Sequence, residues 1–159
     1  MARRARVIKD GGTYHVINRI NEGKELLRDA HFKHLFLTVL RQAKTQKKFR
    51  FHMKNITIMD NHVHIMLRMR RGQSLSKLMQ WVFSVFAMRY NRMNGRQGHL
   101  WMGRFKSVLI ETTESALRVF EYICNNPVKA GMVTSAKKYE FGYFRLMASP
   151  IYMALFDDD

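Results

Sequence analysis

The chain has 159 residues, of which 47% are hydrophobic and 12% aromatic, enough for one compact domain with a core. Lys and Arg number 28 against 12 Asp and Glu, which leaves a formal net charge of +16. This excess argues against an ordinary near-neutral enzyme of small metabolites. It favours a polyanion partner, nucleic acid before an anionic membrane surface. Between residues 30 and 110, Asp60 is the only acid beside sixteen Lys and Arg, which predicts a phosphate-binding face.

The lone Cys124 excludes an intrachain disulfide framework and a cysteine-rich zinc module. The N-terminus is basic without an apolar segment, and no apolar run approaches a membrane span, so we expect a cytoplasmic protein with no membrane partner. With two prolines, no linker and no repeat, a single domain over 1–159 is expected, with its core at about 7–147. We expect the acidic end, 157–159, to be a frayed terminus rather than a competitor of DNA.

Periodicity and turn signals predict the elements in chain order. A strand over 13–20 precedes a helix that Asp29 caps and that runs to about 46. A hairpin follows, with strands at about 49–59 and 62–69. Ser74 caps a long helix to about 93, and a glycine-rich connector leads to a strand at about 104–111. Thr113 caps a third helix to about 125, which Pro127 ends. Aromatic residues after 134 predict that the tail packs back on the domain.

This order of elements indicates an α+β fold with a ferredoxin-like split βαβ arrangement. We expect an antiparallel sheet with helices on one face and an added C-terminal helix. The other face of the sheet would be available for a ligand.

The second strand of the hairpin alternates apolar residues with two histidines. Because successive side chains of a strand point to opposite faces, His62 and His64 share the face opposite the core, about 7 Å apart at Cα. Two neutral imidazoles there can bind one metal ion. The pattern also suits a pair of surface or hydrogen-bonded histidines, and spacing alone does not choose between these interpretations.

The third helix offers a further donor. Tyr122 and Asn126 are four residues apart and therefore share a helix face. Asn126 can supply an amide oxygen to a metal, with Tyr122 one turn away. Alternatively, Asn126 is a C-terminal cap and Tyr122 an ordinary half-buried tyrosine. Tyr90 has Asn94 at the same spacing among arginines, which makes it a second candidate nucleophile.

The ordered segments GGTYHVINR, HVH, GHLWMGRFKS and EYICNNPVKAGMV make the sequence resemble the REP-associated tyrosine transposases. These are single-domain members of the HUH superfamily of single-stranded DNA endonucleases, and the resemblance covers about residues 7–147. It implies cleavage beside short palindromic hairpins, through a 5′-phosphotyrosine and a free 3′-OH, with Mg²⁺ or Mn²⁺ as cofactor. It implies that His62, His64 and Asn126 bind the metal and that Tyr122, ahead of Tyr90, is the nucleophile. Relatives act as monomers or dimers, and the sequence leaves monomer or homodimer open.

The connector interleaves aromatic and basic residues, as proteins that bind single-stranded DNA do. Trp101 is expected either to stack on a base or to anchor the loop to the core, and Phe105 to anchor it. The residues expected to contact DNA are Arg19, Arg68, Trp101, Arg104, Lys106 and Lys129. Further phosphate contacts are expected from Lys44, Lys47, Lys48, Arg70 and Arg71.

Together these features predict a metal-dependent HUH tyrosine transposase that cleaves and rejoins single-stranded DNA next to REP-type hairpins. One alternative is a non-catalytic protein, derived from such a transposase, that binds DNA or RNA hairpins. Another is a metal-dependent phosphodiesterase that uses activated water, with Tyr122 as a bystander.

Overall fold

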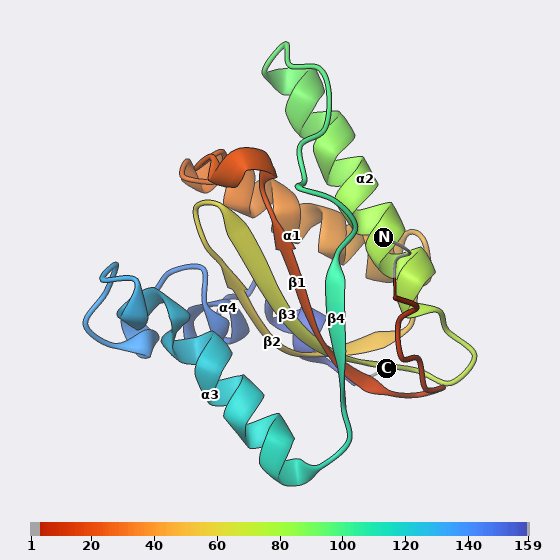
Figure 1. Cartoon of the computed structure of the whole chain (residues 1–159). Helices are drawn as coiled ribbons and strands as arrows, with labels where there is room; N and C mark the ends of the chain where they lie inside the picture. The colour runs from red at the N-terminus through yellow and green to blue at the C-terminus, as the bar shows by residue number, and fades with distance from the viewer. Residues whose placement is uncertain (1–3, 159) are drawn as a thin grey trace.

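The computed structural model describes residues 4–158, in which four strands form one antiparallel sheet with the order β2-β3-β1-β4 (Figure 1). The strands are β1 (Thr13–Arg19), β2 (Phe51–Ile58), β3 (His62–Met69) and β4 (Lys106–Ile110). The helices are α1 (Ala30–Thr45), α2 (Leu75–Met93), α3 (Thr113–Lys129) and the short α4 (Tyr143–Met147). This order and topology confirm the ferredoxin-like α+β fold.

The helix starts follow the capping residues closely. The Asp29 side chain accepts a hydrogen bond from the backbone N–H of His31, and Ser74 caps α2 in the same manner. The third helix is capped by Thr112, whose hydroxyl accepts from the backbone N–H of Ser115, so the prediction of Thr113 was off by one residue. Three of the expected strands extended one or two residues too far, whereas 62–69 was correct.

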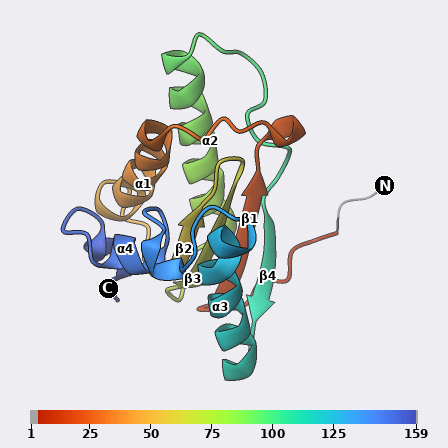
Figure 2. The ribbon, with the colours of Figure 1, turned by 90° about the vertical axis from the view of Figure 1, so that its left-hand side faces the viewer.

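The sheet carries helices on both faces, as Figures 1 and 2 together show. Helices α1 and α2 cover one face, where the buried Val16, Ile65 and Leu67 form part of the main core. Helix α3 packs on the opposite face over a smaller apolar cluster around Met66 and Ile123. The face expected to be open is therefore partly covered by α3, which brings this helix to the histidines of β3.

Pro127 does not end α3, contrary to the sequence-based prediction. A proline inside a helix removes the N–H that would bond to the carbonyl four residues earlier, here that of Ile123. The hydroxyl of Thr57 on β2 donates to this carbonyl instead, at 3.1 Å. The helix continues to Lys129 because the carbonyl that Pro127 deprives of its helical donor finds a partner in the sheet.

The C-terminal segment packs back on the domain as expected. Tyr139 and Phe141 are buried, and the Phe141 carbonyl accepts from the backbone N–H of Ile58 at the end of β2. The acidic end is held rather than frayed: the Asp158 carboxylate lies 3.0 Å from Arg68 and 3.1 Å from Arg70. Asp159, the last residue of the predicted acidic end, lies outside the described residues. No helix within residues 4–158 is both long and apolar enough to traverse a lipid bilayer.

Candidate active site

The strand register assembles a row of polar side chains on the face under α3. In the pairing of β1 with β3, Arg19 lies opposite His62, and Ile17 lies opposite His64. Because side chains alternate along a strand, His15, Ile17 and Arg19 share the face of the two histidines. Three histidines from two adjacent strands therefore come together, although only two of them were expected from the sequence.

His64 is at the centre of this group and is fully buried. Its Nδ1 lies 3.0 Å from Nε2 of His15, and its Nε2 lies 3.3 Å from Nδ2 of Asn126 on α3. The ring of His62 is nearby, with a distance of 4.9 Å between the two ring centroids. The two imidazoles and the Asn126 amide thus meet at one point between the sheet and α3.

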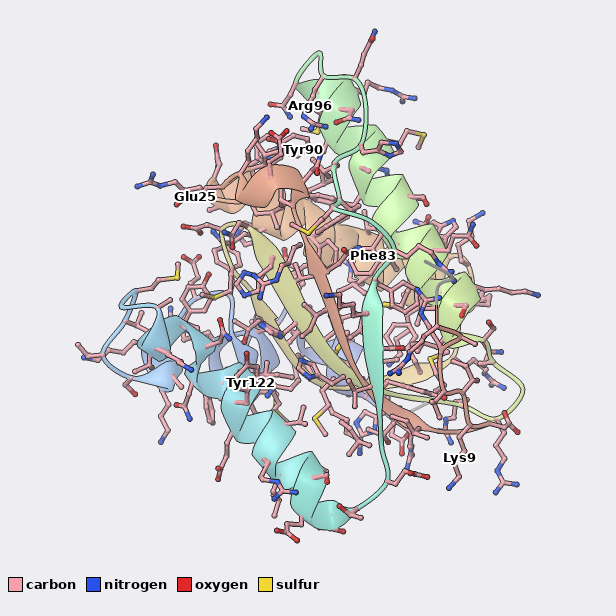
Figure 3. The ribbon with its side chains drawn as sticks, in the orientation of Figure 1. Lys9, Glu25, Phe83, Tyr90, Arg96 and Tyr122 are labelled. Atoms are coloured by element: carbon pink, nitrogen blue, oxygen red, sulfur yellow. The ribbon has the colours of Figure 1, made fainter. Side chains whose placement is uncertain are left out.

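Tyr122 lies one helical turn before Asn126 and faces the same group. Its ring centroid is 5.6 Å from that of His64 and 6.1 Å from that of His15, with edge-on geometry in both pairs. The side chain is 48% exposed, so a DNA backbone can reach the phenol. Figure 3 shows Tyr122 on α3, and Tyr90 at the distant end of the molecule.

Side chains of β2 fix the position of α3 over the histidines. The fully buried Asn55 donates through Nδ2 to the Phe120 carbonyl at 3.0 Å and to Sγ of Cys124 at 3.2 Å. Thr57 donates to the Ile123 carbonyl, as described above. These bonds bracket Tyr122 on the helix backbone, so the sheet itself sets the distance between the tyrosine and the histidines.

The turn that leads into β3 is fixed from the other side of the sheet. The ammonium of Lys33, a nearly buried residue of α1, lies 2.7 Å from the Asp60 carboxylate and 3.2 Å from the Arg28 carbonyl. The backbone carbonyl of Asn61 accepts from the N–H of Ile20 at 2.8 Å. The start of β3, and with it His62, is therefore held by both α1 and the end of β1.

Electrostatics keep the histidines neutral. Burial lowers the pKa of His64 to about 3, and the neighbouring His62, His15 and Arg19 act in the same direction. Burial, followed by the charge of Arg19, lowers the pKa of His62, while a hydrogen bond with the Asn126 side chain opposes this shift, and burial lowers the pKa of His15. Neutral imidazoles retain a lone pair, which is the form that binds a metal.

The donors present fit a divalent metal ion. Two neutral imidazoles and a side-chain amide converge, and first-row divalent ions accept nitrogen and oxygen ligands together. Within residues 4–158 there is no cluster of three or more His, Cys, Asp and Glu side chains arranged to bind a metal. The side chains that would hold a metal at this place are His62, His64 and Asn126.

Tyr90, the second candidate nucleophile, belongs to the core. It is 6% exposed, and its ring packs against Phe32 at 4.6 Å and Phe86 at 6.0 Å between centroids. Burial raises the pKa of its phenol, which disfavours the phenolate. Tyr90 also lies outside the group formed by His64 and Asn126, and this placement favours Tyr122.

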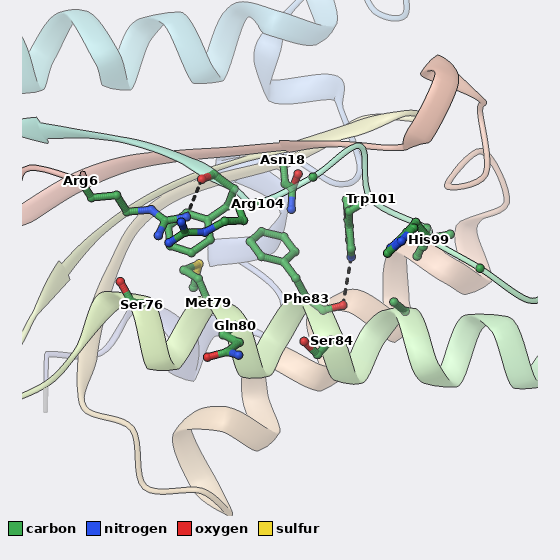
Figure 4. Close-up of a pocket in the computed structure, with 15 residues that line it drawn as sticks. Arg6, Asn18, Ser76, Met79, Gln80, Phe83, Ser84, His99, Trp101 and Arg104 are labelled. Carbon is green, nitrogen blue, oxygen red and sulfur yellow. Dashed lines mark hydrogen bonds between the residues drawn. The ribbon is translucent and has the colours of Figure 1, made fainter. Parts of the chain in front are cut away.

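The aromatic residues of the connector mainly anchor it. Trp101 is 8% exposed, and its indole N–H donates to the Phe83 carbonyl at 3.0 Å (Figure 4). Phe105 is equally buried, and the Arg6 guanidinium lies 3.6 Å from its ring centroid. Both residues line a cavity of about 700 Å³ beside α2, together with the exposed Arg104. Most of the Trp101 side chain is therefore buried against the domain, as expected for a residue that anchors the loop.

The other residues expected to contact DNA differ in availability. Arg19, Lys106 and Lys129 are exposed, and Arg19 and Lys106 lie on the sheet face that carries His64. Arg68 is paired with Asp158, so its charge is already partly compensated. Among the further candidates, Lys44 and Arg70 also contact the C-terminal segment, whereas Lys47, Lys48 and Arg71 are exposed.

The sequence reasoning missed His15 and Asn61 as members of this site. His15 is on the same face as Ile17 and Arg19 in the first strand, an alternation that is visible in the segment TYHVINR. Asn61 falls between the two strands expected for the hairpin, yet its side chain contacts His62 at 2.7 Å. The alternation could have indicated His15, but only the turn geometry shows the contact of Asn61.

Comparison with known proteins places this geometry in a family. The sequence profile of the IS200-like transposases matches residues 9–126, whereas no curated protein gives a significant match. A REP-associated tyrosine transposase solved with a REP hairpin superimposes with a TM-score of 0.77 at 21% identity, covering 96% of this chain and 90% of that one. A candidate transposase of Deinococcus radiodurans superimposes with a TM-score of 0.52 at 15% identity, covering 79% and 97%. At these identities the two structures establish a shared fold, while the profile spans most of the sequence: the chain belongs to the IS200-like transposase family.

Proposed function

We propose that this transposase is a metal-dependent transesterase that cleaves and rejoins single-stranded DNA beside hairpins through Tyr122. One observation carries the proposal: Tyr122 and Asn126, one turn apart on α3, both meet His64 on the sheet. The proposed reaction needs a nucleophile beside metal-binding donors, whereas a protein that only binds DNA requires neither.

The protein residues have separate roles in this proposal. His62, His64 and Asn126 would bind a divalent ion, Mg²⁺ or Mn²⁺, which when bound supplies a positive charge that polarises a phosphodiester and orients it for in-line attack. The exposed Arg19, beside His62 in the strand register, would neutralise a neighbouring phosphate. Tyr122 would attack from the open edge of the group, where its side chain is accessible.

The chemistry balances without an external energy source. The Tyr122 oxygen forms a bond to phosphorus as the bond from phosphorus to the 3′-oxygen breaks; the phenol loses its proton and the leaving oxygen gains one. The 5′-phosphotyrosine keeps the ester linkage, so a later 3′-OH can attack the phosphorus and release the tyrosine. Cleavage and rejoining are therefore the same reaction in two directions.

Hairpin DNA is the proposed substrate. The structurally similar REP-associated transposase was solved with a REP hairpin, and the present chain carries the same fold with a net charge of +16. The exposed Lys106, which lies across β1 from His64 in the strand register, and the exposed Lys129, three residues after Asn126 on α3, extend the basic surface. All the proposed catalytic side chains come from one chain, as a monomer would require, and a DNA substrate supports the cytoplasmic location expected above.

A denaturing gel tests the proposal directly. End-labelled single-stranded oligonucleotides with a hairpin are incubated with the protein and Mn²⁺ or Mg²⁺, and the products are separated under conditions that preserve only covalent adducts. We expect a protein–DNA band that Tyr122→Phe abolishes while hairpin binding persists. Tyr90→Phe is the matched control, because it removes a phenol of the core, and it should retain the band.

Each other outcome of the gel identifies a different function. Cleavage without a covalent band would indicate a phosphodiesterase that uses activated water. Hairpin binding with neither cleavage nor a band would indicate a non-catalytic hairpin-binding protein. Loss of the band in Tyr90→Phe, with its survival in Tyr122→Phe, would reverse the assignment of the nucleophile.

A further inference from the structure

We propose that Asn61 and His15 are positioning residues that hold the imidazoles of His62 and His64 in the tautomer protonated on Nδ1. Nε2 of both rings then carries a lone pair and no proton before any cation arrives, and in the metal-free chain the Asn126 amide N–H donates to that of His64. The inference rests on the proposed function for its purpose, since the lone pairs are those that the metal would use. The tautomers themselves are a property of the metal-free chain and can be measured there.

The Asn61 amide decides the tautomer of His62. Its Nδ2 lies 3.3 Å from the Gly23 carbonyl, which can only accept a hydrogen bond, so the amide nitrogen belongs at that side. The amide oxygen then faces Nδ1 of His62 at 2.7 Å. Because an amide oxygen can only accept, Nδ1 of His62 carries the proton, and the Nε2 of a neutral ring is left with its lone pair.

His15 has the corresponding role for His64. Nδ1 of His64 and Nε2 of His15 lie 3.0 Å apart, so one of the two nitrogens donates to the other. On the opposite side of the ring, the Asn126 amide nitrogen lies 3.3 Å from Nε2 of His64 and donates to it. Nε2 of His64 is thus an acceptor, Nδ1 is the donor, and Nε2 of His15 accepts its proton.

The positioning residues are themselves held firmly. His15 lies inside β1 and is 8% exposed, which leaves little room for water to replace it as the acceptor. Asn61 is fixed through its backbone carbonyl, which accepts from the Ile20 N–H, and through Asp60, whose carboxylate is paired with Lys33. The ring orientations of His62 and His64 are therefore set by the sheet and its turn.

The arrangement differs from the usual support of a metal-binding histidine. Such a histidine generally donates its second N–H to a carboxylate, a backbone carbonyl or water. Here the acceptors are a neutral amide oxygen and a neutral imidazole, and neither adds negative charge to the site. The group formed by His15, Asn61, His62, His64 and Asn126 is thus pre-organised in geometry, and none of these five side chains is an acid that would repel a DNA phosphate.

Nitrogen NMR on the metal-free protein tests the tautomers without any variant. With ¹⁵N-labelled histidine and EDTA at neutral pH, we expect protonated-type shifts for Nδ1 and unprotonated-type shifts for Nε2 in both His62 and His64. A proton on Nε2 of either ring would overturn the assignment for that ring. The measurement does not depend on whether any substituted protein folds.

Mn²⁺ affinity tests the consequence. His15→Leu removes the acceptor, whereas His15→Gln keeps an oxygen near the place of Nε2, and the two variants form a matched pair. Loss of such outer partners typically weakens metal binding by about 10–100-fold. We expect a loss of that size in His15→Leu and in Asn61→Ala, with affinity largely retained in His15→Gln. Equal affinities of His15→Leu and the unchanged protein would refute the role of His15.

The two proposals fail in distinguishable ways. If the tautomers and the Mn²⁺ affinities are as expected but no DNA adduct forms, the transesterase proposal is wrong and the positioning role stands. If the adduct forms while His64 carries its proton on Nε2, the positioning role is wrong and the catalytic proposal stands. Tyr122→Phe should leave both the tautomers and Mn²⁺ binding unchanged, because its phenol belongs to neither hydrogen-bond pair.

Discussion

The bond between Thr57 and the Ile123 carbonyl explains how a helix with an internal proline stays in register with the sheet. Thr57→Val preserves shape and volume while it removes the side-chain hydroxyl that donates to this carbonyl. Thr57 is fully buried, so water cannot replace it easily. An acceptor left buried without a partner costs about 1–3 kcal/mol, and we expect a loss of stability of that size.

The proline provides the decisive comparison. In Pro127→Ala the backbone N–H returns at position 127, four residues after Ile123, and can donate to the same carbonyl. Thr57→Val should therefore cost much less in the Pro127→Ala background. We expect the double-mutant cycle to give a coupling of about 1–2 kcal/mol between the two positions.

Urea unfolding of the four proteins in EDTA measures this coupling, since chelation keeps metal binding from changing the apparent stability. Thr45→Val is the matched control: the Thr45 hydroxyl also donates to a helical carbonyl, that of Arg41, but the residue is exposed. It should change stability by less than about 0.5 kcal/mol. If Thr57→Val costs the same with and without Pro127, the proposed replacement of the missing N–H is wrong.

Three more outcomes follow from the electrostatics. Because the pKa of His64 is lowered in the fold from 6.5 to about 3, the unfolded chain binds more protons between these values. In EDTA the contribution of neutral His64 to the free energy of unfolding should be complete above about pH 6.5. It should fall as the pH is lowered, by up to about 1.4 kcal/mol per pH unit. An equally steep fall in His64→Gln would show that His64 is not the group responsible. Arg19→Ala should lower the slope of log affinity against log salt for single-stranded DNA by about 0.7, whereas an unchanged slope would remove Arg19 from the phosphate contacts. Lys33→Met should lower the free energy of unfolding in urea by about 2–3 kcal/mol, less than the loss of a fully buried pair because the Asp60 side chain is 25% exposed. Adding Asp60→Asn to Lys33→Met should recover part of that stability. A loss below about 0.5 kcal/mol would show that the pair does not fix the turn.

Local patterns in the sequence were sufficient for most of the fold. Alternation in 62–69 gave the correct strand and the correct face for His62 and His64, because a period of two leaves no other assignment. Asp29 and Ser74 mark helix starts because their side chains satisfy free N–H groups within three residues. These features depend only on neighbours in the chain.

Contacts between distant segments decided the rest. Pro127 is a reliable helix end only when the orphaned carbonyl has no other partner, and that partner, Thr57, lies on β2. From the sequence, Trp101 could either stack on a base or anchor a loop. In the fold its indole N–H donates a hydrogen bond to the backbone carbonyl of Phe83 on α2, which anchors the loop. The sequence by itself determined which side chains share a face; only the tertiary structure decided which faces meet, because the pairing of β1 with β3 and the docking of α3 depend on residues far apart in the chain.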